Sequence, residues 1–391
     1  IRPSIQANIL FVLLHDEDGT VGMGECFFGP KVVETYLHEA AAEVLFSFDS
    51  PSPESVSAAL RPYVGFQSGG AEMRGNSAID LALWDLMGKR LGVSLTQLFG
   101  GPLYERLPIY NTCAGPGYVS ESARQVSDNW GLDRQADGLD DLNSFLTQPA
   151  RLARDLWDEG IRGMKVWPFD RAAEASGGNR ISRKEMRDAV AVIAAIRDEL
   201  GDEMEIMVEL HGLWNLPTAA AICKELTPYR PFWIEDPIRP DGVWQLAALK
   251  QETGVPIATG ETLATRRAFL TLLERRAVDM ITMDVQWLGG PTEGRKVASM
   301  ADTFGIPVAP HDCTGPTALA TAVALSFSSP NALIQETVRA FLRTWYTELV
   351  DGLPRIEGGN VFCPDAPGHG VSLREDLDNR MTVERRVTRR G

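Results

Sequence analysis

The fold of this chain is decided by three apolar stretches that each end at a glutamate: Ile206-Met207-Val208-Glu209, Phe232-Trp233-Ile234-Glu235 and Ile257-Ala258-Thr259-Gly260-Glu261. Each has the length and composition of a short buried strand. A (β/α)₈ barrel repeats a strand and a helix about every 25–35 residues and gathers the carboxyl ends of its strands around one site. Glutamates that lie far apart in the sequence are therefore expected to converge.

The alternation of strand and helix extends in both directions from these stretches, as is typical of parallel βα units. From Leu107 onward the candidate strands are Leu107–Asn111, Gly163–Trp167, Glu205–Leu210, Pro231–Ile234, Pro256–Thr259, Met280–Met283, Pro307–Ala309 and Ala332–Gln335. Amphipathic helices are indicated at Thr147–Asp158, Arg183–Leu200, Thr218–Leu226, Leu263–Arg276, Thr292–Phe304 and Gly315–Phe327. Eight strands close a barrel of this type, so we predict an α/β barrel.

The residues before the barrel predict a separate α+β unit. Ala7–Leu14 and Val21–Cys26 look like two strands joined by an acidic turn, and helical periodicity follows at Val32–Phe46, Pro53–Leu60 and Asn76–Leu91, with Asn76 as the N-cap. We expect residues 1–106 to form a capping domain, residues 107–338 the barrel, and residues 339–391 a C-terminal segment that packs back on the capping domain and completes it. Because the chain begins at Ile1 rather than Met, we also expect an N-terminal piece, including the first strand of the cap, to be missing.

The composition excludes several classes of function. The chain has 391 residues, of which 53 are acidic and 38 basic, for a formal net charge of −15. Nucleic acid and anionic membranes reward a basic surface, so neither is expected as a partner. No window approaches the roughly 18–20 apolar residues of a membrane span. The five cysteines are dispersed without CxxC spacing, which is typical of reduced thiols and predicts a cytoplasmic protein. The sequence has no GxSxG elbow and no GK[ST] phosphate loop.

Glu209, Glu235 and Glu261 predict a metal site. Three hard oxygen ligands suit Mg²⁺, which keeps its remaining octahedral positions for water and substrate oxygens. The alternative is that each acid merely caps the next helix and is solvated. That alternative is reasonable for one glutamate, but it weakens when three consecutive units end in the same way.

A proton-transfer group is predicted at the strand ends that follow. Asp284 ends the sixth strand and His311 comes just after the seventh. Neighbouring barrel strands lie about 4.8 Å apart, so these side chains can meet in a hydrogen bond. The carboxylate would set the tautomer of the imidazole and raise its basicity. His211 lies two residues beyond Glu209, and if the strand continues both side chains point to the same face.

Lys165 and Glu336 complete the ring of strand-end residues. Lys165 ends the second strand, where it can pair with the carboxylates, donate to a substrate oxygen, or act as a base if its pKa is depressed. Glu336 ends the eighth strand, and its alternative role is a salt bridge to Arg339 or Lys165. Carboxylates and histidines gathered in one pocket describe a divalent metal beside a proton-transfer apparatus.

At this point the pattern resembles the enolase superfamily, specifically its mandelate racemase-like subgroup of acid-sugar enzymes. The supporting stretches are Trp233-Ile234-Glu235-Asp236-Pro237, Gly260-Glu261-Thr262, and Asp284 through Leu288-Gly289-Gly290 to Glu293. The resemblance implies a modified TIM barrel, (β/α)₇β-like, with an α+β cap. It also implies abstraction of the proton α to a carboxylate by a Lys or His base with Mg²⁺. Carried onto this chain, it implies one Mg²⁺ per subunit on Glu209, Glu235 and Glu261, an Asp284–His311 dyad, and Glu336 as the acid that hydrogen-bonds the enolate.

Two departures from that subgroup direct the choice of reaction. The racemase ends its second strand in Lys-x-Lys, whereas here the second lysine is replaced by Trp167, which argues against a racemase with two bases. The first metal ligand is Glu209, where Asp is commoner. The Glu209-x-His211 pairing is similar to the subgroup's sugar-acid dehydratases, in which the histidine protonates the departing hydroxyl. We therefore hypothesise that His311 removes the C2 proton of an aldonate-type acid and that His211 helps water leave, giving a 2-keto-3-deoxy acid.

Two other functions stay open at the level of sequence. One is a cycloisomerase or an epimerase or racemase that works through the same enediolate, with Lys165 and His311 on opposite faces of the substrate. The other is a metal-binding barrel without activity that serves as a sensor or scaffold.

The residues that would select the substrate are aromatic. The resemblance implies that the capping domain and the first barrel loop close over a small-molecule carboxylate, and Phe27, Phe28, Trp167 and Trp287 are the candidate contacts. The long insertion Gly115–Asp141, which contains Trp130, is expected to serve as a lid. The resemblance further implies a homo-oligomer, and octamers are common in the family.

Overall fold

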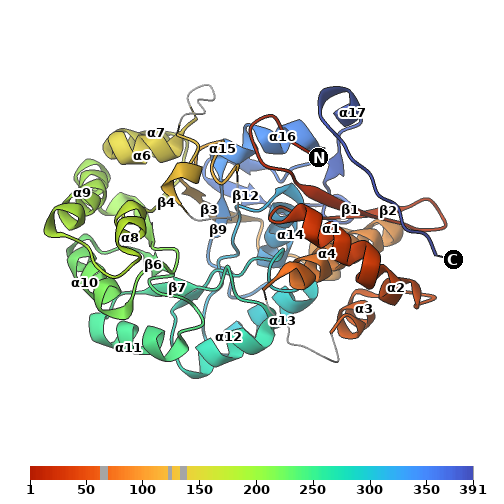
Figure 1. Cartoon of the computed structure of the whole chain (residues 1–391), viewed down its shortest axis with the longest axis horizontal. Coiled ribbons are helices and arrows are strands. Elements are labelled where there is room, and N and C mark those ends of the chain that lie inside the picture. Colours follow the sequence, from red (N-terminus) through yellow and green to blue (C-terminus); the bar gives the residue numbers. More distant parts are fainter. Residues whose placement is uncertain (62–68, 122–125, 133–138, 391) are drawn as a thin grey trace.

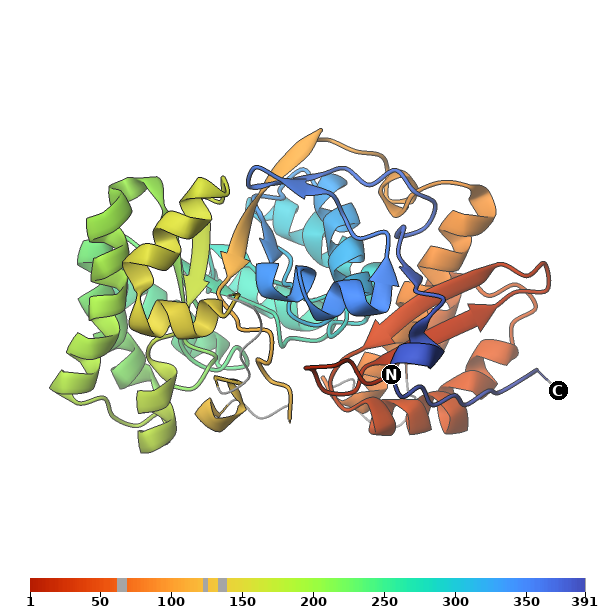
Figure 2. The same ribbon diagram turned by 90° about the horizontal axis from the view of Figure 1, so that it is seen from above.

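The computed structural model describes residues 1–61, 69–121, 126–132 and 139–390. The chain forms a barrel ringed by helices and a smaller α+β cap beside it (Figures 1 and 2). Both termini lie at the cap (Figure 1). The predicted α/β class and the capped-barrel architecture are confirmed.

The barrel is one parallel sheet that closes on itself. Its strands are β3 (Arg106–Thr112), β4 (Gly163–Val166), β5 (Glu205–Glu209), β6 (Trp233–Glu235), β7 (Ile257–Thr259), β8 (Met280–Ile281) and β9 (Gln335–Thr337). Strands β3 to β8 pair in chain order, and β9 pairs with β3. Val308 fills the remaining place, because it bridges Ile281 of β8 on one side and Ala332 on the other.

The strand predicted at Pro307–Ala309 is therefore reduced to a single bridging residue. Pro307 and Pro310 flank it, and proline has no backbone N–H to donate to a sheet. The segment still keeps the course of a strand, since the Ala309 N–H donates to the Ile281 carbonyl at 2.9 Å and the His311 N–H donates to the Met283 carbonyl at 3.0 Å. This alignment brings His311 to the carboxyl end of the barrel.

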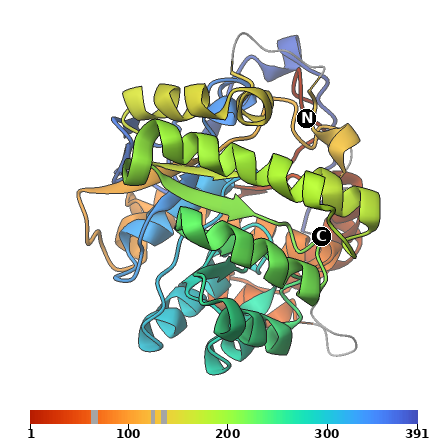
Figure 3. The ribbon, with the colours of Figure 1, turned by 90° about the vertical axis from the view of Figure 1, so that its left-hand side faces the viewer.

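Helices surround the sheet on its outer side (Figures 1 and 3). They are α6 (Asp141–Thr147), α7 (Pro149–Asp158), α8 (Asp170–Ser176), α9 (Arg183–Leu200), α10 (Leu216–Leu226), α11 (Val243–Thr253), α12 (Thr265–Glu274), α13 (Gly290–Thr303) and α14 (Pro316–Phe327), with short 3₁₀ turns η2 (Ser127–Asn129), η3 (Gly201–Glu203) and η4 (Thr227–Tyr229). The helix expected over Thr147–Asp158 is divided at Gln148, because Pro149 starts a new helix.

The cap combines a two-stranded hairpin with helices. Its elements are β1 (Leu10–His15), β2 (Val21–Cys26), α1 (Pro30–Tyr36), the π-helical turn η1 (Leu37–Ala41), α2 (Ala42–Phe46), α3 (Pro53–Ala59), α4 (Ala71–Leu91) and α5 (Leu95–Leu98). β2 lies directly against α4, where a Cβ on Gly24 would stand 2.0 Å from the Ala78 carbonyl oxygen. The prediction that Asn76 caps α4 is wrong: the helix begins at Ala71, and Asn76 instead accepts a hydrogen bond from the Tyr36 hydroxyl at 2.7 Å.

The last part of the chain returns from the barrel to the cap. It contains α15 (Arg339–Leu342), α16 (Trp345–Leu349), β10 (Val350–Asp351), β11 (Ile356–Glu357), β12 (Asn360–Phe362), β13 (Ser372–Leu373) and α17 (Leu377–Arg380). β12 pairs antiparallel with β3 of the barrel. His369 contacts the Met23 carbonyl of the cap at 2.9 Å, and Arg386 pairs with Glu39. The boundaries at residues 106 and 338 stay predictions, and these contacts support a tail that completes the cap.

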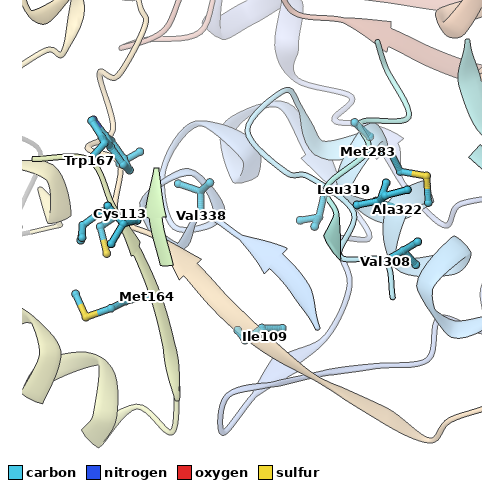
Figure 4. Packing of buried hydrophobic residues seen from close by; sticks show 14 of the residues in the cluster. Ile109, Cys113, Met164, Trp167, Met283, Val308, Leu319, Ala322 and Val338 are labelled. Carbon is cyan, nitrogen blue, oxygen red and sulfur yellow. The ribbon is translucent and has the colours of Figure 1, made fainter. Parts of the chain in front are cut away.

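The interior of the barrel is packed rather than open. One layer of it consists of Tyr110, Met207, Trp233, Ala258, Met280, Ala309 and Ile334. A larger apolar cluster joins the sheet to its helices and to the cap; Figure 4 shows part of it, from Met164 and Trp167 to Val308 and Leu319. All five cysteines lie in the described part of the chain and none is in a disulfide. Among the described residues, no helix is both long and apolar enough to cross a membrane.

Candidate active site

The three glutamates predicted as metal ligands lie together. Glu209, Glu235 and Glu261 end or follow β5, β6 and β7, and parallel pairing places Glu209 directly beside Glu235. One carboxylate oxygen from each lies within 4.8 Å of the others, and all three side chains are buried. The prediction that these residues converge is borne out, because the register of the sheet aligns the ends of its strands.

These carboxylates fit a cation. Oε2 of Glu209 and Oε1 of Glu235 are buried and accept no hydrogen bond from any residue that the structure describes, and the first of them has only an ion pair with the Lys165 ammonium at 3.5 Å. Burial raises the pKa of Glu235 and of Glu261, and the neighbouring carboxylates add to the effect. Buried anionic oxygens without donors are costly. A hard divalent ion would satisfy them, which is the chemistry that a triad of glutamates offers.

The other oxygens of Glu209 and Glu235 are fixed by the protein. Oε1 of Glu209 accepts from the backbone N–H groups of Leu210 at 3.0 Å and His211 at 2.7 Å. Oε2 of Glu235 accepts from the indole N–H of Trp233 at 3.0 Å. The carboxylates are therefore held in place before any ligand arrives.

Lys165 stands among the acids at the end of β4. Its ammonium lies 2.9 Å from Glu336, 3.2 Å from Glu235 and 3.5 Å from Glu209. Burial alone would lower the pKa of Lys165, but the charges of Glu235 and Glu336 outweigh it and raise the pKa well above its usual value. Lys165 is therefore a fixed cation, which does not favour a role as a base.

Glu336 forms a salt bridge with Lys165, which is one of the two partners that the sequence suggested; the other, Arg339, pairs elsewhere. Its second oxygen accepts from the Asp312 backbone N–H at 3.1 Å, and Thr112 at the end of β3 donates to the first. Burial raises the pKa of Glu336, but the cations of Lys165 and His311 outweigh this and hold it below its ordinary value. Arg339 is occupied by Asp141 at 2.6 Å.

Asp284 and His311 form the predicted dyad. Nδ1 of His311 lies 2.6 Å from Oδ2 of Asp284, while Nε2 lies 3.3 Å from Glu261. The same Asp284 oxygen accepts from the Thr314 hydroxyl, and its other oxygen accepts from two backbone N–H groups, those of Gln286 and Trp287. Burial would lower the pKa of His311, but the surrounding carboxylates raise it to about 10. The carboxylate thus holds the imidazole through Nδ1 and directs Nε2 to the glutamates.

His211 reaches the same pocket by a route that differs from the expected one. β5 stops at Glu209, so the strand does not continue, and His211 adopts a left-handed backbone conformation with φ 50°. Its Nδ1 lies 2.8 Å from Oδ2 of Asp170, the first residue of α8. Burial would lower the pKa of His211, but Asp170 and Glu209 raise it to about 10. Sequence reasoning did not find Asp170, because only the fold brings the β4–α8 connection against the end of β5.

Aromatic side chains enclose the pocket from two sides. Phe27 and Phe28 come from the cap, whereas Trp167 and Trp287 come from the barrel, and all four line the same cavity as Lys165, His211 and His311. The Phe28 and Trp287 rings lie 5.5 Å apart across the domain boundary. The predicted aromatic residues are thus brought together, although their role in substrate selection stays a prediction.

Further residues at the cavity escaped the sequence analysis. Thr112, Tyr118, Val119 and Cys313 also line it. The signal for Thr112 was available, because it ends β3 just as the glutamates end their strands. Tyr118 and Val119 belong to the insertion predicted as a lid, part of which (122–125 and 133–138) lies outside the described residues.

The fold and the site define an enzyme built on a TIM barrel, with its reactive groups at the carboxyl ends of the strands. Residues 3–100 match the family "Mandelate racemase / muconate lactonizing enzyme, N-terminal domain", and residues 148–377 match "Enolase C-terminal domain-like". The chain belongs to the mandelate racemase-like subgroup of the enolase superfamily.

Known relatives narrow the class of reaction. A D-galactonate dehydratase of Ralstonia pickettii is 30% identical over 386 residues, covering 96% of this chain and 90% of that protein. A D-gluconate dehydratase of Thermoproteus tenax is 29% identical over 388 residues, covering 96% and 70%. The crystal structure of a mandelate racemase-subgroup enolase from Agrobacterium tumefaciens matches with a TM-score of 0.83 at 39% identity, covering 97% of this chain and 94% of that one. The chain is accordingly an enzyme, a dehydratase.

Proposed function

We propose that this enzyme dehydrates an acid sugar of the aldonate class to a 2-keto-3-deoxy acid in a Mg²⁺-dependent reaction. The observation that carries the proposal is the meeting of the Asp284–His311 dyad and His211 in one pocket beside three buried glutamates. Relatives named as galactonate and gluconate dehydratases support the substrate class.

Glu209, Glu235 and Glu261 would hold one Mg²⁺ per subunit. When bound, the ion would supply positive charge that lowers the pKa of the nearby histidines and stabilises the negative charge developing on the substrate carboxylate. Lys165 stays protonated between Glu235 and Glu336, where its ammonium can donate to a substrate carboxylate oxygen.

His311 is the proposed base. Because the Nδ1–H group donates a hydrogen bond to Asp284, the neutral imidazole presents a lone pair at Nε2, and this atom takes the proton from C2 of the substrate. The electrons of the C2–H bond move into the carboxylate to form an enediolate. The resemblance implies a hydrogen bond from Glu336 to that enediolate, and this role requires the protonated carboxyl group, because a carboxylate has no proton to donate.

His211 is the proposed acid. As the C3–O bond breaks, His211 gives a proton to the departing hydroxyl, which leaves as water. The balance is one C–H bond and one C–O bond broken, one C2=C3 bond formed, and one water released. The enol then tautomerises to the keto acid.

A mass-spectrometric screen of aldonic and aldaric acids for the loss of water tests the proposal directly. Product is confirmed by its semicarbazone, and reactions in D₂O report proton exchange at C2. His311→Asn should abolish both exchange and product, whereas His211→Asn should retain exchange and lose product. Full turnover by His311→Asn on the true substrate would overturn the assignment.

The same assays separate the proposal from the alternatives. A cycloisomerase or epimerase would exchange deuterium or rearrange the ring without producing a keto acid. That mechanism needs Lys165 as a second base, and its three carboxylate contacts disfavour this. A scaffold without activity would bind metal but neither exchange nor convert any acid sugar, and the dehydratase relatives speak against it.

The remaining expectations concern the setting of the enzyme. We propose a homo-oligomer, with an octamer as the form that the resemblance suggests, in the cytoplasm and without nucleic acid or membrane partners. Analytical ultracentrifugation tests the proposed oligomeric state, and a protein that sediments only as a monomer would overturn it.

A further inference from the structure

We propose that Asp170 is a positioning residue for proton delivery to the leaving group, and that it acts by fixing the tautomer and orientation of His211. The inference rests on the proposed function only for the step that His211 performs. It concerns the first residue of α8 and a residue in the turn after β5, which sequence spacing does not connect, since Asp170 and His211 are 41 positions apart.

The contact has the geometry of an imidazole–carboxylate dyad. Oδ2 of Asp170 lies 2.8 Å from Nδ1 of His211, and the Asp170 side chain is only 5% exposed. In the Asp284–His311 dyad a carboxylate oxygen also meets Nδ1, at 2.6 Å. The pocket is therefore served by two histidines that are each held through the same ring atom.

The backbone at His211 makes an anchor necessary. A non-glycine residue at φ 50° is uncommon, and such positions persist where surrounding contacts hold them. The His211 N–H donates to Glu209, and the following Gly212 N–H donates to the Asp236 carbonyl at 2.7 Å. These bonds fix the main chain of the turn, whereas the orientation of the ring depends on what the side chain contacts.

The end of β4 supplies those contacts. Trp167, at the place where the racemase has its second lysine, packs edge-on against the His211 ring with centroids 5.8 Å apart. The ring of Trp167 is itself held by Tyr118 at 5.2 Å and Phe145 at 5.1 Å. Asp170 then bonds Nδ1 from the next turn of the same segment. The segment after β4 therefore contributes no base of its own but supports the histidine in the turn that follows β5.

The consequence is a defined site for the proton. Because Oδ2 of Asp170 accepts a hydrogen bond from the Nδ1–H group, His211 delivers its proton from Nε2, and Nδ1 keeps its own proton throughout. Without Asp170 the protonated ring can deliver a proton from either nitrogen and can turn away from the leaving hydroxyl. Removal of the C2 proton by His311 does not depend on this contact.

The test compares two reactions of the same enzyme, C2 exchange in D₂O and formation of keto acid, in Asp170→Ala and Asp170→Asn. A positioned general acid contributes about 10²–10⁴-fold, so Asp170→Ala should lose about 10²-fold or more in dehydration while exchange falls less than about 10-fold. In Asp170→Asn the amide oxygen can still accept a hydrogen bond from the Nδ1–H group of His211, so this variant should recover part of the lost dehydration rate. Asp188→Asn, an exposed position on α9 that is 60% accessible, is the matched control and should behave as wild type.

A second measurement does not depend on the substrate. Nitrogen-15 NMR of the histidine rings, recorded at a pH where His211 is neutral, should show its single proton on Nδ1 in the wild type and shared between the two nitrogens in Asp170→Ala, with the His311 signals unchanged. An equal fall of exchange and dehydration, or an unchanged His211 tautomer, would overturn the inference. If wild-type enzyme converts no acid sugar, the proposed function fails while the NMR result still decides the role of Asp170.

Discussion

Replacement of Asp284 by asparagine should reverse the tautomer of His311. One oxygen of Asp284 accepts from the backbone N–H groups of Gln286 and Trp287, and the other accepts from His311 and Thr314. The backbone donors cannot turn, so the single amide oxygen of asparagine must stay with them. The amide NH₂ then faces Nδ1 of His311, which has to give up its proton, and Nε2 becomes protonated and unable to act as a base.

The size of the effect follows from the hydrogen bonds that are lost. To keep the productive tautomer, the Nδ1–H group of His311 would have to face the amide NH₂ of the new asparagine at a buried site. The variant would also lose the hydrogen bonds that the Asp284 carboxylate accepts from His311 and Thr314, each worth about 1.5–3 kcal/mol. The sum, about 3–6 kcal/mol, corresponds to a fall of about 10²–10⁴-fold in kcat. KM should change little, because Asp284 does not line the cavity.

The assay measures keto acid formation and C2 exchange on the same substrate. Both should fall together in Asp284→Asn, since one base begins both reactions. Asp302→Asn, at an exposed position on α13, serves as the control for the chemical change. A variant that folds normally and retains more than a tenth of wild-type kcat would refute the reasoning about the tautomer.

Three further predictions concern stability, metal and the contact between the domains. Glu25 of β2 is fully buried, and burial raises its pKa from 4.5 to about 8 although the Ala318 N–H lowers it. The folded state therefore holds a proton that the unfolded state releases, so stability is complete below pH 4.5 and falls by up to about 5 kcal/mol as the pH rises to 8. Urea unfolding of Glu25→Gln should lose this slope, and an unchanged slope would contradict the assignment. Mg²⁺ at about 100 times its dissociation constant should stabilise the protein by about 2.7 kcal/mol in a thermal melt, and EDTA should reverse it. A melt that responds no more to Mg²⁺ than to Na⁺ at equal ionic strength would argue against a site at the glutamates. Gln286 accepts from the Phe27 N–H of the cap at 2.9 Å and donates to the Thr314 carbonyl at 3.1 Å. Gln286→Ala should lower kcat/KM about 5–150-fold, mainly through KM, as expected for about 1–3 kcal/mol of lost hydrogen bonds; an unaltered KM would show that this link does not position Phe27.

Much of the site could be predicted because a barrel converts chain order into position. Once the strands were recognised, the residues at their carboxyl ends had to share one face, so Glu209, Glu235, Glu261, Lys165 and Glu336 were predictable without coordinates. The pairing of Asp284 with His311 followed from the spacing of adjacent strands. The errors in the predicted boundaries at Asn76 and Pro307 have local causes. Helix α4 begins at Ala71, before the residue predicted to cap it, and the prolines around Val308 have no backbone N–H groups to pair in a strand.

The contacts that tertiary structure alone decided join segments whose distance along the chain carries no signal. Asp170 meets His211 because the β4–α8 connection folds over the end of β5, and His211 points there only through a left-handed turn. Phe27 enters the pocket because Gln286 binds its backbone across the domain boundary.

The sequence by itself thus determined the ring of acids, histidines and lysine at the strand ends, since the order of the strands in a barrel suffices for that. Only the folded chain decided which carboxylate holds which histidine, that Lys165 is fixed by three acids, and that the cap closes the aromatic wall. The physical reason is range: periodicity reports contacts along one strand or helix, whereas hydrogen bonds of 2.6–2.9 Å between the ends of different loops depend on the packing of every element beneath them.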